Sequence, residues 1–233
     1  MTSEHIPFSP TDQAYFDEFP SGYSPYTPSD LDLILSDLLQ TVEHQPVNWV
    51  CEVGSADGQF SSELARHLPE QVHFLGLDIA ERLLKRYPFH RIHANAFQIP
   101  LKKDALQAIC FTAALHHLTP FSAALDEMER VLAPGGIVYF LEPNYYHPYR
   151  RFFMQFRWLY KFYRAANDVP VNPRKLQAEL TNRGYQKLAF GYINIHFKSP
   201  GFLQSLQNAL AALKWPDNLL PYVMPWFILI AQK

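Results

Sequence analysis

The most constraining feature of this chain is a turn with glycines that joins an apolar segment to an amphipathic one. Residues 48–54 are an apolar run, and residues 59–68 repeat apolar side chains at helical spacing. Between them, small residues at Gly54, Ala56 and Gly58 let the backbone turn tightly and approach a ligand closely. The pattern predicts a strand, a turn and a helix that can face a nucleotide-like ligand. A tight turn without any ligand is the alternative.

Strand-like and helix-like segments alternate along the rest of the chain. We expect further strands at 73–78, 90–95, 108–115, 137–141, 185–195 and 226–232. We expect helices at 31–43, 59–68, 80–86, 119–132, 147–166, 173–183 and 202–213, with Thr119 capping the helix that begins there and Pro120 in its first turn. Such alternation is typical of an α/β fold with a parallel sheet.

Charge, cysteine content and hydropathy restrict the class of protein. The net charge of −2 does not favour a nucleic-acid-binding protein. Cys51 and Cys110 lie in apolar runs and are interpreted as reduced thiols. The first ten residues lack the pattern of a secretory signal, and no stretch approaches the roughly 20 apolar residues of a membrane span. We therefore expect a cytoplasmic protein without an integral membrane segment; the oligomeric state stays open.

An acidic residue at the end of the second strand adds to the case for a nucleotide. Asp78 follows Gly54 by twenty-four residues, where a carboxylate accepts hydrogen bonds from ribose hydroxyls, although Asp78 also suits a helix cap. The dinucleotide fingerprint G-x-G-x-x-G is broken by Ala56 and Gln59, which argues against NAD or FAD. Glu52, two residues before the first glycine, instead favours a cofactor with an ammonium group.

Six stretches together resemble the class I S-adenosylmethionine-dependent methyltransferases, and within them the type 11 group of small-molecule enzymes. The matching stretches are CEVGSADGQF, FLGLDIA, HANAFQIPL, AICFTAALHHL, ERVLAPGGIVYFLEPN and WFILIAQK. They cover residues 47–143 and the end of the chain. The resemblance implies an α/β Rossmann-like fold with a seven-stranded, mostly parallel sheet in the order 3-2-1-4-5-7-6 and an antiparallel last strand. The implied cofactor is S-adenosylmethionine, with S-adenosylhomocysteine as product and no metal.

Four regions follow from this resemblance and from the segments around it. Residues 1–46 form an arm and helix that act as a lid, and residues 47–143 form the cofactor-binding core. Residues 144–184 form a helical cap over the acceptor, and residues 185–233 complete the sheet.

The resemblance also implies which residues bind the cofactor. The loop would line the methionine and ribose parts of the cofactor. Asp78 would bind the ribose hydroxyls, and Ile79 would lie against the adenine. Asn95 and Ala96 would face the adenine amino group, and Ala113 and Leu115 would flank the methionine. The loop residues concerned are Glu52, Gly54, Ser55, Ala56 and Gly58. Two positions depart from the pattern: Ala56 replaces a glycine, and Asn95 replaces an aspartate, so its amide loses the charge-assisted part of the hydrogen bond.

Two histidines are the candidate catalytic residues. His116 and His117 follow the fourth strand, at the sheet edge where the methyl group should emerge. An oxygen nucleophile needs a base near neutrality, and histidine is the usual one. Adjacent side chains point in different directions, so we expect at most one of them to reach the acceptor. A capping or structural histidine is the alternative.

The residues around the fifth strand and in the arm are candidates for binding the acceptor. Aromatic residues offer apolar area, and an arginine can meet an acidic group. The candidates are Tyr23, Tyr26, Glu142, Asn144, Tyr145, Tyr149 and Arg150. Packing within the protein is the alternative for each. A further interpretation of residues 147–166 is a helix at a membrane surface, because arginines and lysines interleave with aromatics there.

The sequence therefore predicts methyl transfer to an oxygen or nitrogen of an apolar, aromatic or lipid-like small molecule. One alternative is an enzyme that uses the bound sulfonium for a cyclisation or rearrangement without methylation. The other is a non-enzymatic methyltransferase-like partner protein, which the intact loop and Asp78 disfavour.

Overall fold

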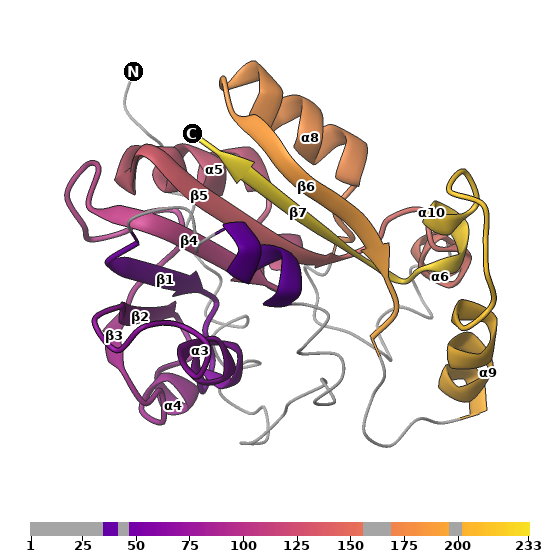
Figure 1. The fold of residues 1–233 in the computed structure, drawn as a ribbon, viewed down its shortest axis with the longest axis horizontal. Coiled ribbons are helices and arrows are strands. Elements are labelled where there is room, and N and C mark those ends of the chain that lie inside the picture. The colour runs from indigo at the N-terminus through magenta and orange to yellow at the C-terminus, as the bar shows by residue number, and fades with distance from the viewer. Residues whose placement is uncertain (1–34, 42–46, 156–168, 196–201) are drawn as a thin grey trace.

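The computed structural model describes residues 35–41, 47–155, 169–195 and 202–233. Within these ranges seven strands form one sheet in the order β3-β2-β1-β4-β5-β7-β6 (Figure 1). The strands are β1 (Trp49–Val53), β2 (His73–Asp78), β3 (His90–His93), β4 (Leu106–Thr112), β5 (Leu132–Pro143), β6 (Gln186–Ile193) and β7 (Trp226–Gln232). Strands β1 to β5 pair in parallel, whereas β7 is antiparallel to both β5 and β6. The predicted sheet order and the antiparallel last strand are confirmed.

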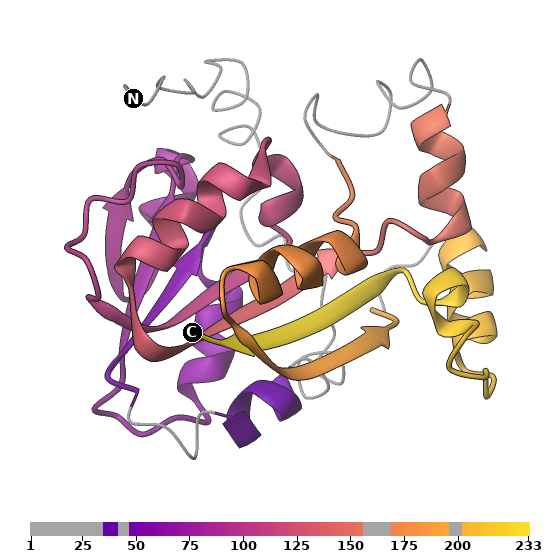
Figure 2. The same cartoon turned by 90° about the horizontal axis from the view of Figure 1, so that it is seen from above.

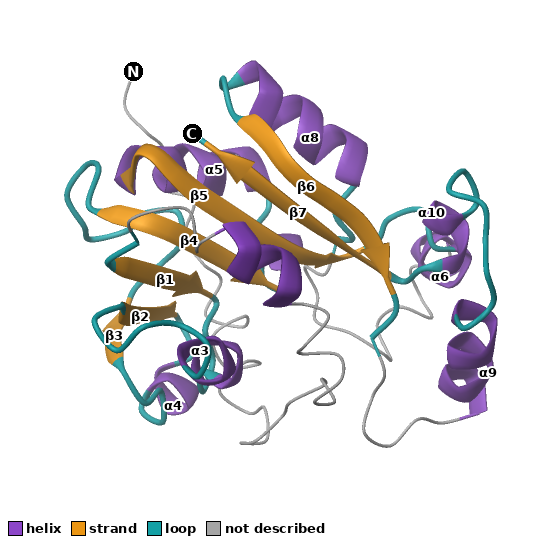
Figure 3. Cartoon of the chain, in the orientation of Figure 1, coloured by secondary structure: helices purple, strands orange, loops and turns teal. Residues whose placement is uncertain are grey.

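Helices follow most of the strands, as Figure 3 shows. They are residues 35–41, α3 (Gln59–Ala65), α4 (Glu81–Leu84), the 3-10 helix η1 (Leu115–His117), α5 (Phe121–Val131), α6 (Pro148–Gln155), α8 (Pro173–Asn182), α9 (Phe202–Ala211) and α10 (Leu220–Val223). The short α10 was not expected, because four residues cannot show a helical periodicity.

The sheet carries a core on each face (Figure 2). Helices α5 and α8 cover one face, and α3 with residues 35–41 covers the other. Successive strand residues point to opposite faces, so Phe140 of β5 packs in the first core and its neighbour Tyr139 in the second. Burial on both sides explains why these strands are apolar throughout rather than alternating.

Several expected boundaries are wrong. Strand β5 begins at Leu132 rather than at residue 137. Strand β4 ends at Thr112 rather than at residue 115, because Ala113 has φ +55° and turns the chain into η1. Thr119 does not cap α5: Pro120 is the N-cap, in an extended conformation, and no side chain bonds to the free N–H groups. A residue before proline is disfavoured in the helical region, so the helix begins only after the Thr119–Pro120 pair.

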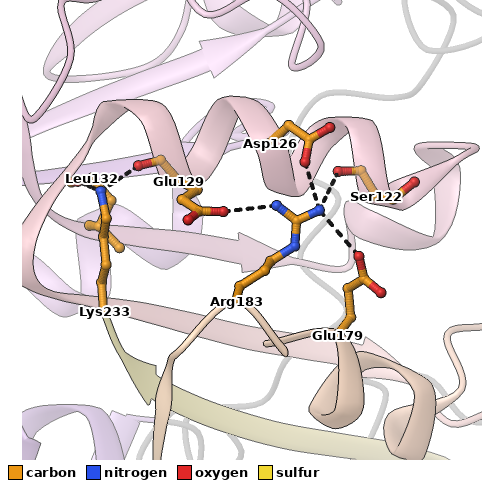
Figure 4. A network of polar contacts seen from close by, with 7 residues as sticks. All are labelled: Ser122, Asp126, Glu129, Leu132, Glu179, Arg183 and Lys233. Carbon is orange, nitrogen blue, oxygen red and sulfur yellow. Dashed lines mark hydrogen bonds and ion pairs between the residues drawn. The ribbon is translucent and has the colours of Figure 1, made fainter. Parts of the chain in front are cut away.

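Arg183, directly after α8, joins this helix to α5 (Figure 4). Its guanidinium lies 2.6 Å from Asp126, 2.9 Å from Glu129 and 3.1 Å from Glu179. In the same region the ammonium of Lys233 donates to the carbonyl oxygen of Glu129 at 2.6 Å. These contacts fix α8 and the end of β7 against α5, on the sheet face away from residues 35–41.

Helices α6, α9 and α10 lie together beyond the ends of β5 and β6 (Figure 1). Gln207 of α9 connects them: its carboxamide oxygen lies 3.1 Å from Nε2 of His147, and its amide group donates to the carbonyl oxygen of Val223 at 2.7 Å. The predicted cap of residues 144–184 is thus composed differently, since α8 packs on the sheet and α9 and α10 join α6. Among the helices that the structure describes, none has the length and apolarity to cross a membrane.

Candidate active site

The glycines of the loop after β1 are required by packing within the protein. Gly54 has φ +73°, and a Cβ there would lie 2.6 Å from Cβ of Ala114. Gly58 has φ +81°, and a Cβ there would lie 2.6 Å from the ring of Tyr87. A larger residue at either position would need both an unfavourable backbone conformation and displacement of its neighbour. The glycines alone therefore show a tight turn, and the indication of a ligand comes from other residues.

Ala56 also lies in the left-handed region, with φ +46°. This conformation costs an L-residue about 1–2 kcal/mol that glycine avoids. We expect Ala56→Gly to raise the free energy of unfolding by about 0.5–1 kcal/mol, since the more flexible unfolded chain offsets part of the gain. Chemical denaturation measures it. Ala178→Gly, at an exposed position in the middle of α8, is the control and should lower stability by about 1 kcal/mol. Destabilisation by both changes would contradict the strain at Ala56.

Asp78, at the end of β2, holds the loop by its carboxylate. One oxygen accepts from the N–H of Ala56 and the other from the N–H of Ala80, both at 2.7 Å. Burial raises the pKa of Asp78, while these N–H groups act in the opposite direction. Each carboxylate oxygen has two acceptor sites, so Asp78 retains acceptor capacity for a ligand hydroxyl. Both anticipated roles, capping and ligand binding, are compatible with this geometry.

Glu52 is buried under the loop, bonded to hydroxyl groups. Ser61 of α3 donates to one carboxylate oxygen at 2.6 Å, and Thr112 at the end of β4 donates to the other at 2.7 Å. Tyr87 extends the network by donating to the hydroxyl of Ser61 at 2.7 Å. Burial raises the pKa of Glu52 to about 7; the two hydroxyls lower it, and the charge of Asp78 raises it further. Sequence reasoning missed Ser61, Thr112 and Tyr87, although a small polar residue on the buried face of a helix is a usable signal.

The polar groups around this loop fit S-adenosylmethionine. Glu52 and Asp78 lie near enough for the charge of one to raise the pKa of the other. Such a pair suits a ligand that carries both a cationic ammonium and a hydroxyl-bearing ribose. The loop backbone is accessible at Gly54, which is exposed, and at Ala56, which is half-buried, whereas Gly58 is buried.

The residues that we expect around the adenine lie after β2 and β3. Ile79 and Asn95 are half-buried, Ala96 is buried, and the Asn95 side-chain oxygen accepts from the N–H of Phe97 at 2.9 Å. Leu115 needs a correction as a neighbour of the methionine. Its side chain is 1% exposed within the core, because the chain leaves the strand at Ala113.

A carboxylate and a histidine meet at the carboxyl ends of β4 and β5. Glu142 is fully buried and lies 2.7 Å from Nδ1 of His116, which is itself buried. The same carboxylate accepts from the N–H groups of Ala114 at 3.0 Å and Leu115 at 2.7 Å. Burial raises the pKa of Glu142 to about 8, opposed by these N–H groups and by the charge of His117. Glu142 thus orients the His116 ring and fixes η1.

The second histidine is placed differently. The ring centroid of His117 lies 3.9 Å from that of His116, and the residue is only half-buried. Glu142 accepts from the backbone N–H of His116 at 3.3 Å and lies 2.7 Å from Nδ1 of its ring. These contacts orient the His116 ring, which favours His116 as the candidate base.

Three expected acceptor contacts need correction. Glu142 has no exposed surface, since backbone N–H groups and His116 occupy its carboxylate. Asn144 has none either: its amide donates to the carbonyl oxygens of Pro221 and Met224, and its oxygen accepts from Tyr146. These bonds attach the end of β5 to α10. The guanidinium of Arg150 is buried over the ring of Trp226, 5.4 Å from its centroid.

An aromatic hollow of about 310 Å³ lies beside these residues. It is lined by Tyr146, Pro148, Arg151, Phe152 and Tyr222. Sequence reasoning named the neighbours Tyr145 and Arg150 instead. The half-buried Tyr145 stands edge-on to Tyr146 and under the guanidinium of Arg151.

The remaining candidates are only partly described. Tyr23 and Tyr26, expected in the lid, lie outside the described residues, as does the side chain of Tyr149. Residues 156–168, the second half of the expected long helix, lie outside them too.

Comparison with known proteins identifies the class. A family profile described as a methyltransferase domain matches residues 51–140. The demethylmenaquinone methyltransferase of Lysinibacillus sphaericus is 26% identical in an alignment of 184 residues that covers 66% of this chain and 77% of that protein. The demethylmenaquinone methyltransferase of Desulfitobacterium hafniense is 29% identical over 192 residues, covering 67% and 75%. The chain contains a methyltransferase domain at residues 51–140, and its fold is that of S-adenosylmethionine-dependent methyltransferases.

The methyltransferase fold extends well beyond the matched residues. A crystal structure of a SAM-dependent methyltransferase from Archaeoglobus fulgidus superimposes with a TM-score of 0.60 and 17% identity, covering 87% of this chain and 94% of that one. This likeness shows the fold. In the part of the methyltransferase that the structure describes, no group of three or more His, Cys, Asp or Glu side chains is arranged to hold a metal ion.

Proposed function

We propose that this methyltransferase transfers a methyl group to an apolar, aromatic or lipid-like small molecule through a hydroxyl group that His116 deprotonates. The observation that carries the proposal is the buried Glu142–His116 pair at the sheet edge, with 2.7 Å between the carboxylate and Nδ1. The aromatic hollow beyond the end of β5 supports an apolar acceptor. The two relatives named as demethylmenaquinone methyltransferases support an aromatic ring that bears oxygen.

Glu142 would control which nitrogen of His116 is basic. When Nδ1 donates its proton to the carboxylate, Nε2 of the neutral ring is left as the proton acceptor. This is the arrangement in which a carboxylate selects the tautomer of a general base. His116 would take the hydroxyl proton of the acceptor, which makes its oxygen, or a ring carbon conjugated to it, nucleophilic. The proposal therefore includes carbon as well as oxygen; a nitrogen acceptor would use the same base.

The loop residues would hold the methyl donor in this reaction. When bound, S-adenosylmethionine supplies an electrophilic methyl group on a sulfonium, and the methyl–sulfur bond breaks as the bond to the acceptor forms. We propose that Asp78 binds the ribose hydroxyls, that Glu52 attracts the ammonium group, and that Ile79, Asn95 and Ala96 surround the adenine. Ser55 is buried at 3% exposure and contributes backbone only.

Incubation with methyl-labelled S-adenosylmethionine and a set of acceptors tests the proposal. The set should include a reduced naphthoquinone, a simple phenol and an aromatic amine, with products identified by mass spectrometry. We expect label in the quinol or phenol and an equal amount of S-adenosylhomocysteine. An acceptor that is rearranged without label transfer would favour the non-methylating alternative. Turnover of an acceptor that carries neither a hydroxyl nor an amine proton, at the same rate, would refute the role of the base.

A further inference from the structure

Helix α9 has polar side chains toward the protein and apolar side chains toward the outside, the reverse of a helix that packs on a core. Its amide side chains point toward the protein, where Gln207 bonds to Val223 and Asn208 accepts from the amide of Asn194 at 3.0 Å. Two of its leucines point outward: Leu206 is 48% exposed and Leu210 is 41% exposed. Leu213, just beyond the helix end, is 57% exposed and continues this row at helical spacing. A surface helix normally has the opposite orientation, so α9 requires an apolar surface outside the described chain.

We call the exposed leucines, together with the exposed apolar residues of α6 and α10, which lie beside α9, the cap face. It consists of Phe152, Leu206, Leu210, Leu213, Leu219 and Tyr222, which are between 39% and 57% exposed. Phe152 of α6 and Tyr222 of α10 line the same hollow, and α9 bonds to both elements through Gln207 and the residues beside them. Large exposed apolar residues gathered on one surface mark a contact with a membrane or another molecule.

The charge of the chain is divided in a way that favours one partner. Residues 143–233 contain twelve Lys or Arg and three Asp or Glu, whereas residues 1–142 contain eight and nineteen. The net charges are thus +9 and −11. Residues 144–167 hold five Lys or Arg and no acid. Some of these cations bond within the fold, as Arg183 does, but Arg151 lies exposed on α6 and Lys214 is exposed next to α9. An apolar surface within the basic part of an acidic protein matches an anionic lipid bilayer.

We propose that the cap face docks on the surface of a bilayer that contains anionic lipids. Leu206, Leu210 and Leu213 enter the region between headgroups and acyl chains, and the exposed cations Arg151 and Lys214 contact lipid phosphates. Leucines are the side chains that gain most from entering the acyl region, which favours a bilayer over a nucleic acid. The anionic lipids repel the acidic first part of the chain, so the protein is oriented with the cap face toward the bilayer. This inference stands without the proposed acceptor.

Vesicle co-sedimentation of the full chain, with neither cofactor nor acceptor, tests it. Vesicles of phosphatidylcholine alone are compared with vesicles that also contain phosphatidylglycerol. We expect binding to the second kind, weakened about tenfold or more by Leu210→Asp and about fivefold by Arg151→Gln. Leu188→Asp on β6, 39% exposed, and Arg66→Gln on the acidic part are matched controls that should bind as the unchanged protein does.

Three results would overturn the inference. The first is no binding to anionic vesicles, and the second is equal binding to both kinds. The third is binding of another molecule to the cap face. A second copy would be seen as a dimer that Leu210→Asp dissociates, and a nucleic acid would be seen as an RNA oligonucleotide that displaces the vesicles. Methyl transfer to a water-soluble phenol is measured separately with the unchanged protein and with Leu210→Asp, which does not alter the hollow, so failure of the docking does not affect the test of the proposed function.

Discussion

Replacing His116 with glutamine should lower kcat by about 10²–10⁴-fold, the range for loss of a general base. Binding of S-adenosylmethionine, measured by calorimetry, should change little, because the effect lies in removal of the acceptor proton. For the unchanged protein we expect kcat to rise with pH through about 8, since the Glu142–His116 pair must lose a proton before Nε2 can act, and the raised pKa of Glu142 sets that range. The pH dependence should disappear with the base.

Two matched variants separate this role from a structural one. His117→Gln changes the neighbouring imidazole and should retain most of the activity. Glu142→Gln keeps the shape of the side chain, but its amide group would donate to Nδ1 and leave the His116 proton on Nε2, so activity should fall about 10²-fold or more. Equal losses for both histidines, or a His116→Gln protein with full activity at saturating acceptor, would be incompatible with His116 as the base.

The second large effect concerns Glu52 and pH. Because the pKa of Glu52 is about 7 in the folded protein against its ordinary 4.5, the folded state holds a proton that the unfolded state has lost. The free energy of unfolding should therefore fall as pH rises from about 4.5 to about 7, by roughly 3 kcal/mol from this group. Above about pH 7 no further loss from Glu52 is expected.

Glu52→Gln isolates this contribution, since Asp78 and Glu142 also have raised pKa values and add slopes of the same sign. Denaturant unfolding at several pH values should show a shallower pH dependence in the variant. Glu63→Gln on α3 should leave the slope as it is. S-adenosylmethionine should weaken the slope in the unchanged protein, because its ammonium favours the ionised carboxylate. Identical slopes in the Glu52→Gln and unchanged proteins would mean that Glu52 is ionised throughout.

The sequence was sufficient to predict the order of the strands in the sheet, but it did not predict which groups surround the polar residues at the sheet edge. Apolar runs and the stretches around the loop predicted β2 and β7 to the residue, because strands buried on both faces leave a continuous apolar pattern. The same reasoning extended β4 to Leu115, since nothing in the letters Ala-Ala-Leu shows that Ala113 has a positive φ.

The candidate site was harder to predict, for a reason that Glu142 and Asn144 illustrate. Both are polar residues at the correct sheet edge, and their residue types do suit substrate binding. Their partners are backbone groups of η1 and α10, which come from distant segments, and a single sequence does not show such pairings. Arg150 and Arg151 are similarly indistinguishable as letters, yet one is buried over Trp226 and the other lines the hollow.

The carboxylate of Asp78, bonded to the N–H groups of Ala56 and Ala80, has a consequence for cofactor binding. With Gly54 and Gly58 packed against Ala114 and Tyr87, the loop already has a single conformation supported from several directions. Such a site is preorganised: the entropy of ordering the loop is lost once, during folding, and not again when a ligand arrives. Association of the cofactor should then resemble the filling of a rigid receptor, with little accompanying change in hydrogen-exchange protection around β1 and β2.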